Sequence, residues 1–259
     1  MVKRELKVNL KSFLIWSLSV CLLLILVFCI YPSISHKMEI DKLLTIFPDE
    51  IINGFNFNVV SLSTVFGWYA SEGFMITTLI GGLFAVMLGA NILLKEESDK
   101  TINFLYAMPI SRNKILGSKI LAGALYIIAF NLLIMIVTGI GFKLSGDFEL
   151  NKWLLLTLTP ILVHLVLFVL TLLVSCYMKK TGQAMGLMFG VTLVFYMLNM
   201  ISQMDESLDF LSFITPFGYI DVTEIVKNGL INWYYGIILV IGLVISFFLV
   251  RRYNNKELI

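Results

Sequence analysis

The stretch KEESDKTINFLYAMPISRNKILGSK, residues 95–119, separates two apolar runs that are each long enough to cross a bilayer. Ser98 is placed to cap a helix N-terminus, and Asp99 puts negative charge in the first turn, where the helix dipole favours it. Ile102 and Leu105 are three residues apart and share one helical face. The stretch therefore predicts a short amphipathic helix.

A proline ends this helix. Pro109 lacks a backbone donor and disfavours helical geometry in the residue before it. Ser111 follows and is placed to cap the next helix, which enters the membrane. We expect a helix at about residues 97–108 that lies on the inner membrane surface and is rigidly joined to a spanning helix.

The spacing of polar and apolar residues here resembles the signature of the type-2 ABC exporter permeases. In that family the segment is a cytoplasmic coupling helix that docks on an ATPase subunit. The resemblance implies an ATPase-coupling role for Glu96, Glu97, Thr101, Ile102, Leu105, Pro109, Ser111 and Arg112, and Ile110, Ile115 and Lys119 also fit the pattern. One position departs from the pattern. The family usually has glycine before the threonine, whereas Lys100 stands there, so the conformation of the turn at this point is left undecided.

Composition sets the class of protein. Hydrophobic residues make up 59% of the 259-residue chain and charged residues 14%, whereas soluble domains are about 45–50% apolar and about 25% charged. The chain is therefore expected to be an all-α polytopic membrane protein with a single permease domain, residues 1–259. Its cysteines lie inside apolar runs without metal-type spacing and are expected to be small buried hydrophobes.

Apolar runs predict six membrane spans. They lie at about residues 13–31, 73–94, 120–142, 153–178, 182–201 and 233–250. Residues 3–12 mix basic and apolar positions and predict an interfacial helix before the first span, which Pro32 ends. Residues 33–70 are expected to form an outer loop with a surface helix. Residues 205–231 are expected to hold two short outer helices around Pro216.

The distribution of basic residues predicts the orientation. With both termini inside, the inner segments hold fourteen of the nineteen lysines and arginines. The positive-inside rule therefore favours cytoplasmic termini. Trp68, Trp153 and Trp233 then fall at the outer boundaries, where aromatic residues are enriched.

Small residues recur at four-residue spacing in two spans and allow close helix approach. One set is Gly81, Ala85 and Gly89, and the other is Gly182, Gly186 and Gly190. The second set suits packing within the subunit or against a second copy, and the sequence leaves both open. The resemblance implies that the first, second and fifth spans face a dimer axis.

Catalytic motifs are absent from the sequence. It has no G-x-x-x-x-G-K-[ST], no H-E-x-x-H and no G-x-S-x-G. No catalytic residue and no metal site is therefore expected, and the chain is expected to bind no cofactor itself. If transport is active, ATP and magnesium must be held by a partner subunit.

Polar residues inside spans are candidates for function. Asn131 and His164 lie near the middle of the third and fourth spans, and Asn199 lies near the outer end of the fifth. Each fits an interhelical hydrogen bond or a position on a translocation path. Glu72, at the outer start of the second span, is expected to be a solvated boundary charge.

The resemblance implies a permease subunit of an ATP-driven exporter in the bacterial cell membrane. Its expected partners are two copies of a cytoplasmic ABC ATPase, a second permease chain (the same or a paralogue) and the bilayer, with no nucleic acid. An apolar path suits hydrophobic or amphipathic cargo such as a peptide (for example an antimicrobial one), a drug or a lipid. The alternative is a membrane scaffold or peptide sensor that needs no ATPase. A passive channel is disfavoured because the spans offer too few polar positions for a lined pore.

Overall fold

The computed structural model describes residues 1–35, 48, 52, 64–102, 110–146 and 148–255. Within this part of the chain every regular element is a helix, and six stretches are long and apolar enough to cross a membrane. The predicted all-α fold with six spans is therefore confirmed. The elements are α1 (Val2–Ser35), α4 (Val65–Trp68), η1 (Tyr69–Gly73), η2 (Ile76–Ile80), α5 (Gly81–Ser98), α7 (Arg112–Leu144), α8 (Leu150–Ser175), α9 (Thr181–Ser202), η3 (Glu206–Ile214), α10 (Val222–Asn228), η4 (Trp233–Gly236) and α11 (Ile237–Asn254).

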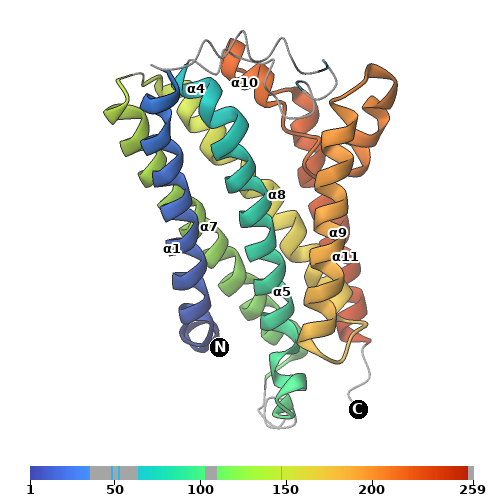
Figure 1. The fold of residues 1–259 in the computed structure, drawn as a ribbon. Helices are drawn as coiled ribbons and strands as arrows, with labels where there is room; N and C mark the ends of the chain where they lie inside the picture. Colours follow the sequence, from blue (N-terminus) through green and yellow to red (C-terminus); the bar gives the residue numbers. More distant parts are fainter. Residues whose placement is uncertain (36–47, 49–51, 53–63, 103–109, 147, 256–259) are drawn as a thin grey trace.

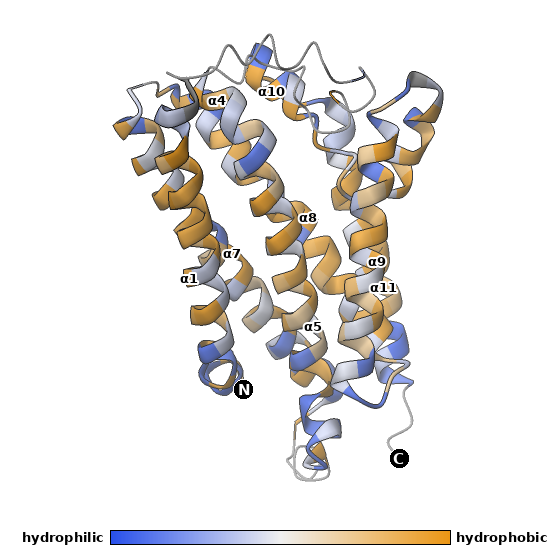
Figure 2. Ribbon diagram, in the orientation of Figure 1, coloured by the Kyte–Doolittle hydropathy of each residue, from blue (hydrophilic) through white to orange (hydrophobic). Residues whose placement is uncertain are grey.

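The long helices form two layers. In Figure 1, α1, α5 and α9 lie in front, and α7, α8 and α11 lie behind them. Helix α8 is central because it packs against α5, α7, α9 and α11. The two chain ends lie at the same end of the bundle, here named the terminal end, and α10 lies at the opposite, distal end. Figure 2 shows hydrophilic residues gathered mainly at these two ends, with apolar residues between them.

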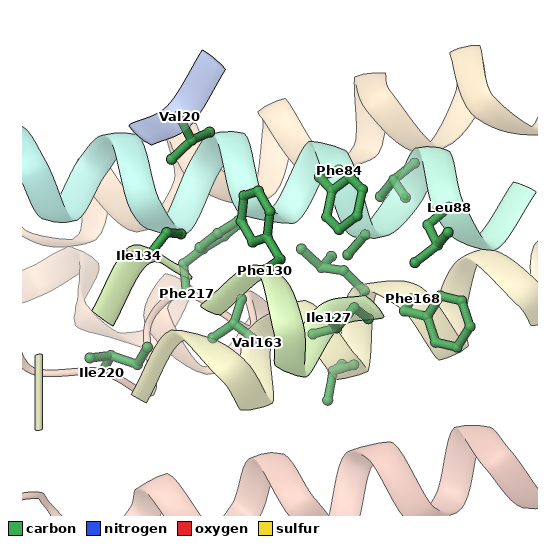
Figure 3. Packing of buried hydrophobic residues seen from close by; sticks show 14 of the residues in the cluster. Val20, Phe84, Leu88, Ile127, Phe130, Ile134, Val163, Phe168, Phe217 and Ile220 are labelled. Carbon is green, nitrogen blue, oxygen red and sulfur yellow. The ribbon is translucent and has the colours of Figure 1, made fainter. Parts of the chain in front are cut away.

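Aromatic side chains fill the contact between the layers. Phe84 of α5 stacks on Phe130 of α7 with ring centroids 4.7 Å apart, and both are buried. Phe168 of α8 and Val20 of α1 belong to the same buried cluster (Figure 3). Because lipid tails are as apolar as these side chains, close van der Waals packing rather than water exclusion holds the helices together in a bilayer.

The second span begins earlier than the sequence analysis placed it. It was expected at residue 73 after an outer loop ending at residue 70, but helix starts at Val65, where the Thr64 hydroxyl accepts a hydrogen bond from Gly67 N. The indole of Trp68 donates to the Val27 carbonyl at 2.9 Å, so the added turn packs against α1. Two π-helical segments, η1 and η2, then precede α5.

The first helix is continuous from Val2 to Ser35. No break separates the predicted interfacial residues 3–12 from the span, although Figure 1 shows the first turns nearly end-on and the rest of α1 running along the bundle. Pro32 lies inside the helix, so the expectation that it ends the span is wrong. A proline removes only one backbone donor, and near a helix end this loss leaves the remaining turn intact.

Two short helices flank Pro216, namely η3 and α10. Asp205 caps η3 by accepting a hydrogen bond from Ser207 N. Hydrogen bonds from Ser207 hold the pKa of the Asp205 carboxyl below its usual value. Asp221 caps α10 by accepting from Glu224 N. Gly229 ends α10 with φ +65°, a left-handed conformation that suits glycine. The surface helix expected between residues 33 and 70 falls largely outside the described residues.

Candidate functional site

A buried ion pair joins α5 to α7 at the terminal end. Glu96 lies in the last turn of α5 and is 5% exposed, and Lys119 lies on α7 and is 1% exposed. The Lys119 ammonium donates to Glu96 Oε2 at 2.8 Å and also to the backbone carbonyl of Ile92, one turn earlier on α5. Two acceptors on one helix therefore hold the Lys119 side chain.

Helix α1 adds two further charges to this pair. Glu5, 4% exposed, places Oε1 3.7 Å from Lys119 Nζ, and Arg4 Nη2 lies 3.7 Å from Glu96 Oε1. We name Arg4, Glu5, Glu96 and Lys119 the charge network. Its charges alternate in sign and come from three helices, which compensates part of the desolvation cost of burying them.

Further bonds fix the start of α1 beside the network. Asn9 is buried and donates to the Glu5 carbonyl at 3.0 Å, and the Tyr126 hydroxyl of α7 donates to the Leu6 carbonyl. Glu5 was not among the predicted site residues. A signal was present, because Glu5 is the only acidic residue among the first 38 positions and lies within a basic segment.

The turn after α5 is a Schellman motif. Thr101 N donates to the Glu96 carbonyl and Lys100 N to the Glu97 carbonyl, which is the bond pair that defines this helix ending. Lys100 has φ +57°, in the left-handed region that favours glycine. The position where the family pattern has glycine therefore keeps the backbone conformation that glycine suits.

Ser98 acts differently from the expectation. It ends α5 rather than capping a following helix, and Asp99 is the C-cap residue of α5. The Ser98 hydroxyl instead accepts a hydrogen bond from Thr181 N at 2.9 Å, which satisfies a free donor at the start of α9. The short helix therefore cannot begin at residue 97. Within the predicted range 97–108, residues 103–108 lie outside the described part of the chain.

The other predicted coupling residues lie around this junction. Glu97 and Ile102 are partly buried, and Thr101 is exposed. Ser111 occupies the N-cap position of α7 without a side-chain capping bond, and Arg112 donates to the Asn254 carbonyl of α11 at 3.0 Å. Leu105 and Pro109 lie outside the described residues. Glu96 is the buried member of this set, and its ionic contacts join α5 to α1 and α7.

Asn131 and His164 lie together in the middle of the bundle. Asn131 Nδ2 is 3.1 Å from His164 Nδ1, and each residue is 1% exposed. Neither lines either of the two cavities found at the distal end. Within the described residues they form a packed interhelical contact between α7 and α8.

Asn199 lies elsewhere, at the distal end of α9. It lines both a cavity of about 560 Å³ and a smaller one of about 170 Å³. Among the residues predicted to lie on a translocation path, Asn199 is thus the one that lines these two cavities.

The two sets of small residues face different surroundings. A Cβ added to Gly81 would lie 2.4 Å from the His164 ring, and Gly89 lies against the Phe168 carbonyl and Thr171 of α8. The first set, Gly81, Ala85 and Gly89, therefore packs inside the chain. Around Gly182, Gly186 and Gly190 no atom lies within 4 Å of an added Cβ, among the residues that the structure describes.

One family of known proteins matches this chain over nearly its whole length. A family model described as ABC-2 family transporter protein matches residues 1–258. A search of curated proteins finds no match.

Proposed function

Because the chain belongs to the ABC-2 transporter family and is thereby a membrane-spanning permease component of an ABC transporter, we propose that it serves an exporter. In this proposal two permease chains work with two cytoplasmic ABC ATPase subunits. ATP and magnesium bind to the ATPase, and this chain binds no cofactor. The cargo is hydrophobic or amphipathic and leaves the cell.

The observation that carries the proposal is the charge network. It joins the helix ending that precedes residues 103–109 to α1 and α7 through buried ionic contacts. Buried, hydrogen-bonded charges resist separation, because each would be left without a partner in a medium of low polarity. A push on the segment after α5 would therefore move three helices together.

The charge distribution supports an inward terminal end. The described basic residues at that end include Lys95, Lys100, Lys114, Lys179 and Arg251, and the positive-inside rule places such an end in the cytoplasm. A cytoplasmic ATPase would then meet the coupling residues directly. We place the chain in the bacterial cell membrane with both termini cytoplasmic.

The arrangement of helices supports a dimer. Helices α1, α5 and α9, which contain the first, second and fifth spans, lie in the same layer (Figure 1). The glycine face of α9 is open within the described chain and allows close approach of another helix. We therefore propose that α9 contacts a second permease chain, and a homodimer is the simplest form.

The composition of the spans supports apolar cargo. Large apolar side chains remain exposed along α1, α7, α9 and α11. A path bordered by such side chains suits a peptide, drug or lipid better than a hydrated ion.

Co-purification tests the proposal. The tagged permease is co-expressed with the ABC ATPase encoded beside it, and both are reconstituted together in liposomes. We expect a stable complex, ATPase activity that rises on reconstitution, and loss of both after Glu97→Lys combined with Leu105→Arg. A permease that is stable and active without any ATPase, or a double variant that behaves as wild type, would contradict the proposal and favour a scaffold.

A further inference from the structure

Two cavities at the distal end share one wall. The larger, of about 560 Å³, lies between the end of α9, η3 and residues 218–223. The smaller, of about 170 Å³, reaches the π-helical start of the second span. Asn199, Gln203, Ile220 and Val222 line both. The volume of the larger cavity falls within the range of about 300–1,000 Å³ that is typical of small-molecule sites.

The charge of these walls is entirely negative. Glu72 lines the smaller cavity, and Asp205, Asp209 and Asp221 line the larger one. No lysine, arginine or histidine is among the described lining residues of either. A cavity whose charges are all of one sign focuses its field and attracts a cation.

Glu72 is the carboxylate of the smaller cavity. It lies in the π-helical segment η1, near the start of the second span, and is partly buried. It forms no hydrogen bond or ion pair with another residue that the structure describes. A carboxylate in this environment is costly unless a donor satisfies it. π-Helical turns inside α-helices occur frequently at functional sites.

The wall that the two cavities share contains an unsatisfied acceptor. Gln203 Oε1 is buried and has no hydrogen-bond partner within the described chain. Gln203 belongs to the wall that the two cavities share.

The remaining lining selects an organic cation over a metal ion. No group of three or more His, Cys, Asp or Glu side chains suited to a metal occurs in the described part of the chain. Aromatic rings line the cavities instead, with Tyr196 and Phe217 in the smaller one and Phe213, Tyr219 and Tyr234 in the larger. Aromatic faces attract ammonium and guanidinium groups, and they also contact apolar chains.

We propose that the two cavities form one binding site for an amphipathic organic cation, whose ammonium or guanidinium group reaches Glu72. The acidic residues of the larger cavity draw the cation in, and the aromatic rings hold its apolar part. The described lining residues all come from this chain, so we expect binding without an ATPase. Lipid headgroups with a primary ammonium and water-soluble amines share this chemistry.

Fluorescence anisotropy with dansylcadaverine tests the site. This probe joins an aromatic group to a primary ammonium through an alkyl chain, and its N-acetylated form differs only in lacking the charge. The full chain is studied in phosphatidylcholine nanodiscs, with empty nanodiscs subtracted. We expect saturable binding that weakens with ionic strength, because the outer carboxylates are exposed to solvent. The acetylated form should bind at least about ten-fold more weakly.

Variants separate the site from general surface charge. Glu72→Gln keeps the shape of the side chain and should weaken binding about ten-fold or more. Asp209→Asn, on an exposed residue that caps no helix, should weaken it about two- to five-fold. Glu149→Gln is the matched control: Glu149 is exposed near the same end, lines neither cavity and should leave affinity unchanged. Asp205 and Asp221 are left intact because they cap helices.

Two results would overturn the proposal: equal binding of the charged and acetylated probes, or wild-type affinity in both Glu72→Gln and Asp209→Asn. Adding phosphatidylethanolamine to the nanodiscs identifies the natural source. Displacement of the probe assigns the site to a lipid headgroup, and undiminished binding assigns it to a water-soluble amine.

Discussion

Lys119 on α7 donates a hydrogen bond of 2.8 Å to Glu96 on α5, although both side chains are almost fully buried. The contact joins two residues that the sequence pattern places at opposite ends of one polar stretch. Glu96 therefore braces the bundle from inside, and under the proposed function other residues of this stretch would contact the ATPase.

Removing Lys119 should destabilise the protein more than removing either carboxylate. Lys119→Met would leave Glu5 and Glu96 buried without their shared cation, and breaking a buried pair in this way costs about 3–5 kcal/mol. Glu96→Gln leaves Lys119 with Glu5 3.7 Å away and should cost less. The melting temperature in detergent measures the order, with Lys114→Met on the exposed face of α7 as control. A melting temperature for Lys119→Met equal to that of the control would contradict the bracing role.

Much of this architecture was predictable. Runs of apolar residues identify six spans because each must satisfy its backbone inside the bilayer. The charge network was not predictable, since nothing in the sequence around Glu5 indicates that the start of α1 packs beside Lys119 of α7. Helix ends were also misplaced. Thr64 and Ser98 have similar capping chemistry in the sequence. Thr64 caps the helix that directly follows it by a local bond from Gly67 N, whereas Ser98 accepts from Thr181 N, a contact between distant segments that a local pattern does not indicate.

Lys100→Gly should stabilise the turn that follows α5. Lys100 has φ +57°, and a side chain there costs about 1 kcal/mol that glycine avoids, although glycine also gains freedom in the unfolded chain. We expect a net gain of about 0.5 kcal/mol, seen as a higher melting temperature. Lys100→Ala is the control, because it removes the charge and keeps the strain. If alanine stabilised the protein as much as glycine, charge rather than backbone conformation would be responsible.

Gly81→Ala should destabilise the middle of the bundle. The added Cβ would lie 2.4 Å from the His164 ring, which is held by its contact with Asn131. Overpacking of this kind typically costs about 1–3 kcal/mol. The double variant Gly81→Ala with His164→Ala should cost less than the sum of the single changes, because the clash is gone. Additive losses in thermal melts would show that Gly81 and His164 do not constrain each other.

Gly186→Trp should weaken association of two permease chains while leaving each chain folded. No atom of the neighbouring described elements lies within 4 Å of a Cβ at this position, so a side chain can leave the backbone here without a clash at its first atom. A bulky ring on a small-residue face prevents the close backbone approach that such faces provide between membrane helices. The fraction of dimer in nanodiscs or by crosslinking should fall several-fold, and the melting temperature should stay close to that of the wild type.

Gly117→Trp on α7 is the matched control. This position also has no atom within 4 Å of an added Cβ, but it belongs to no glycine stripe. An unchanged dimer fraction in Gly186→Trp would exclude the glycine face of α9 from the interface and leave it facing lipid.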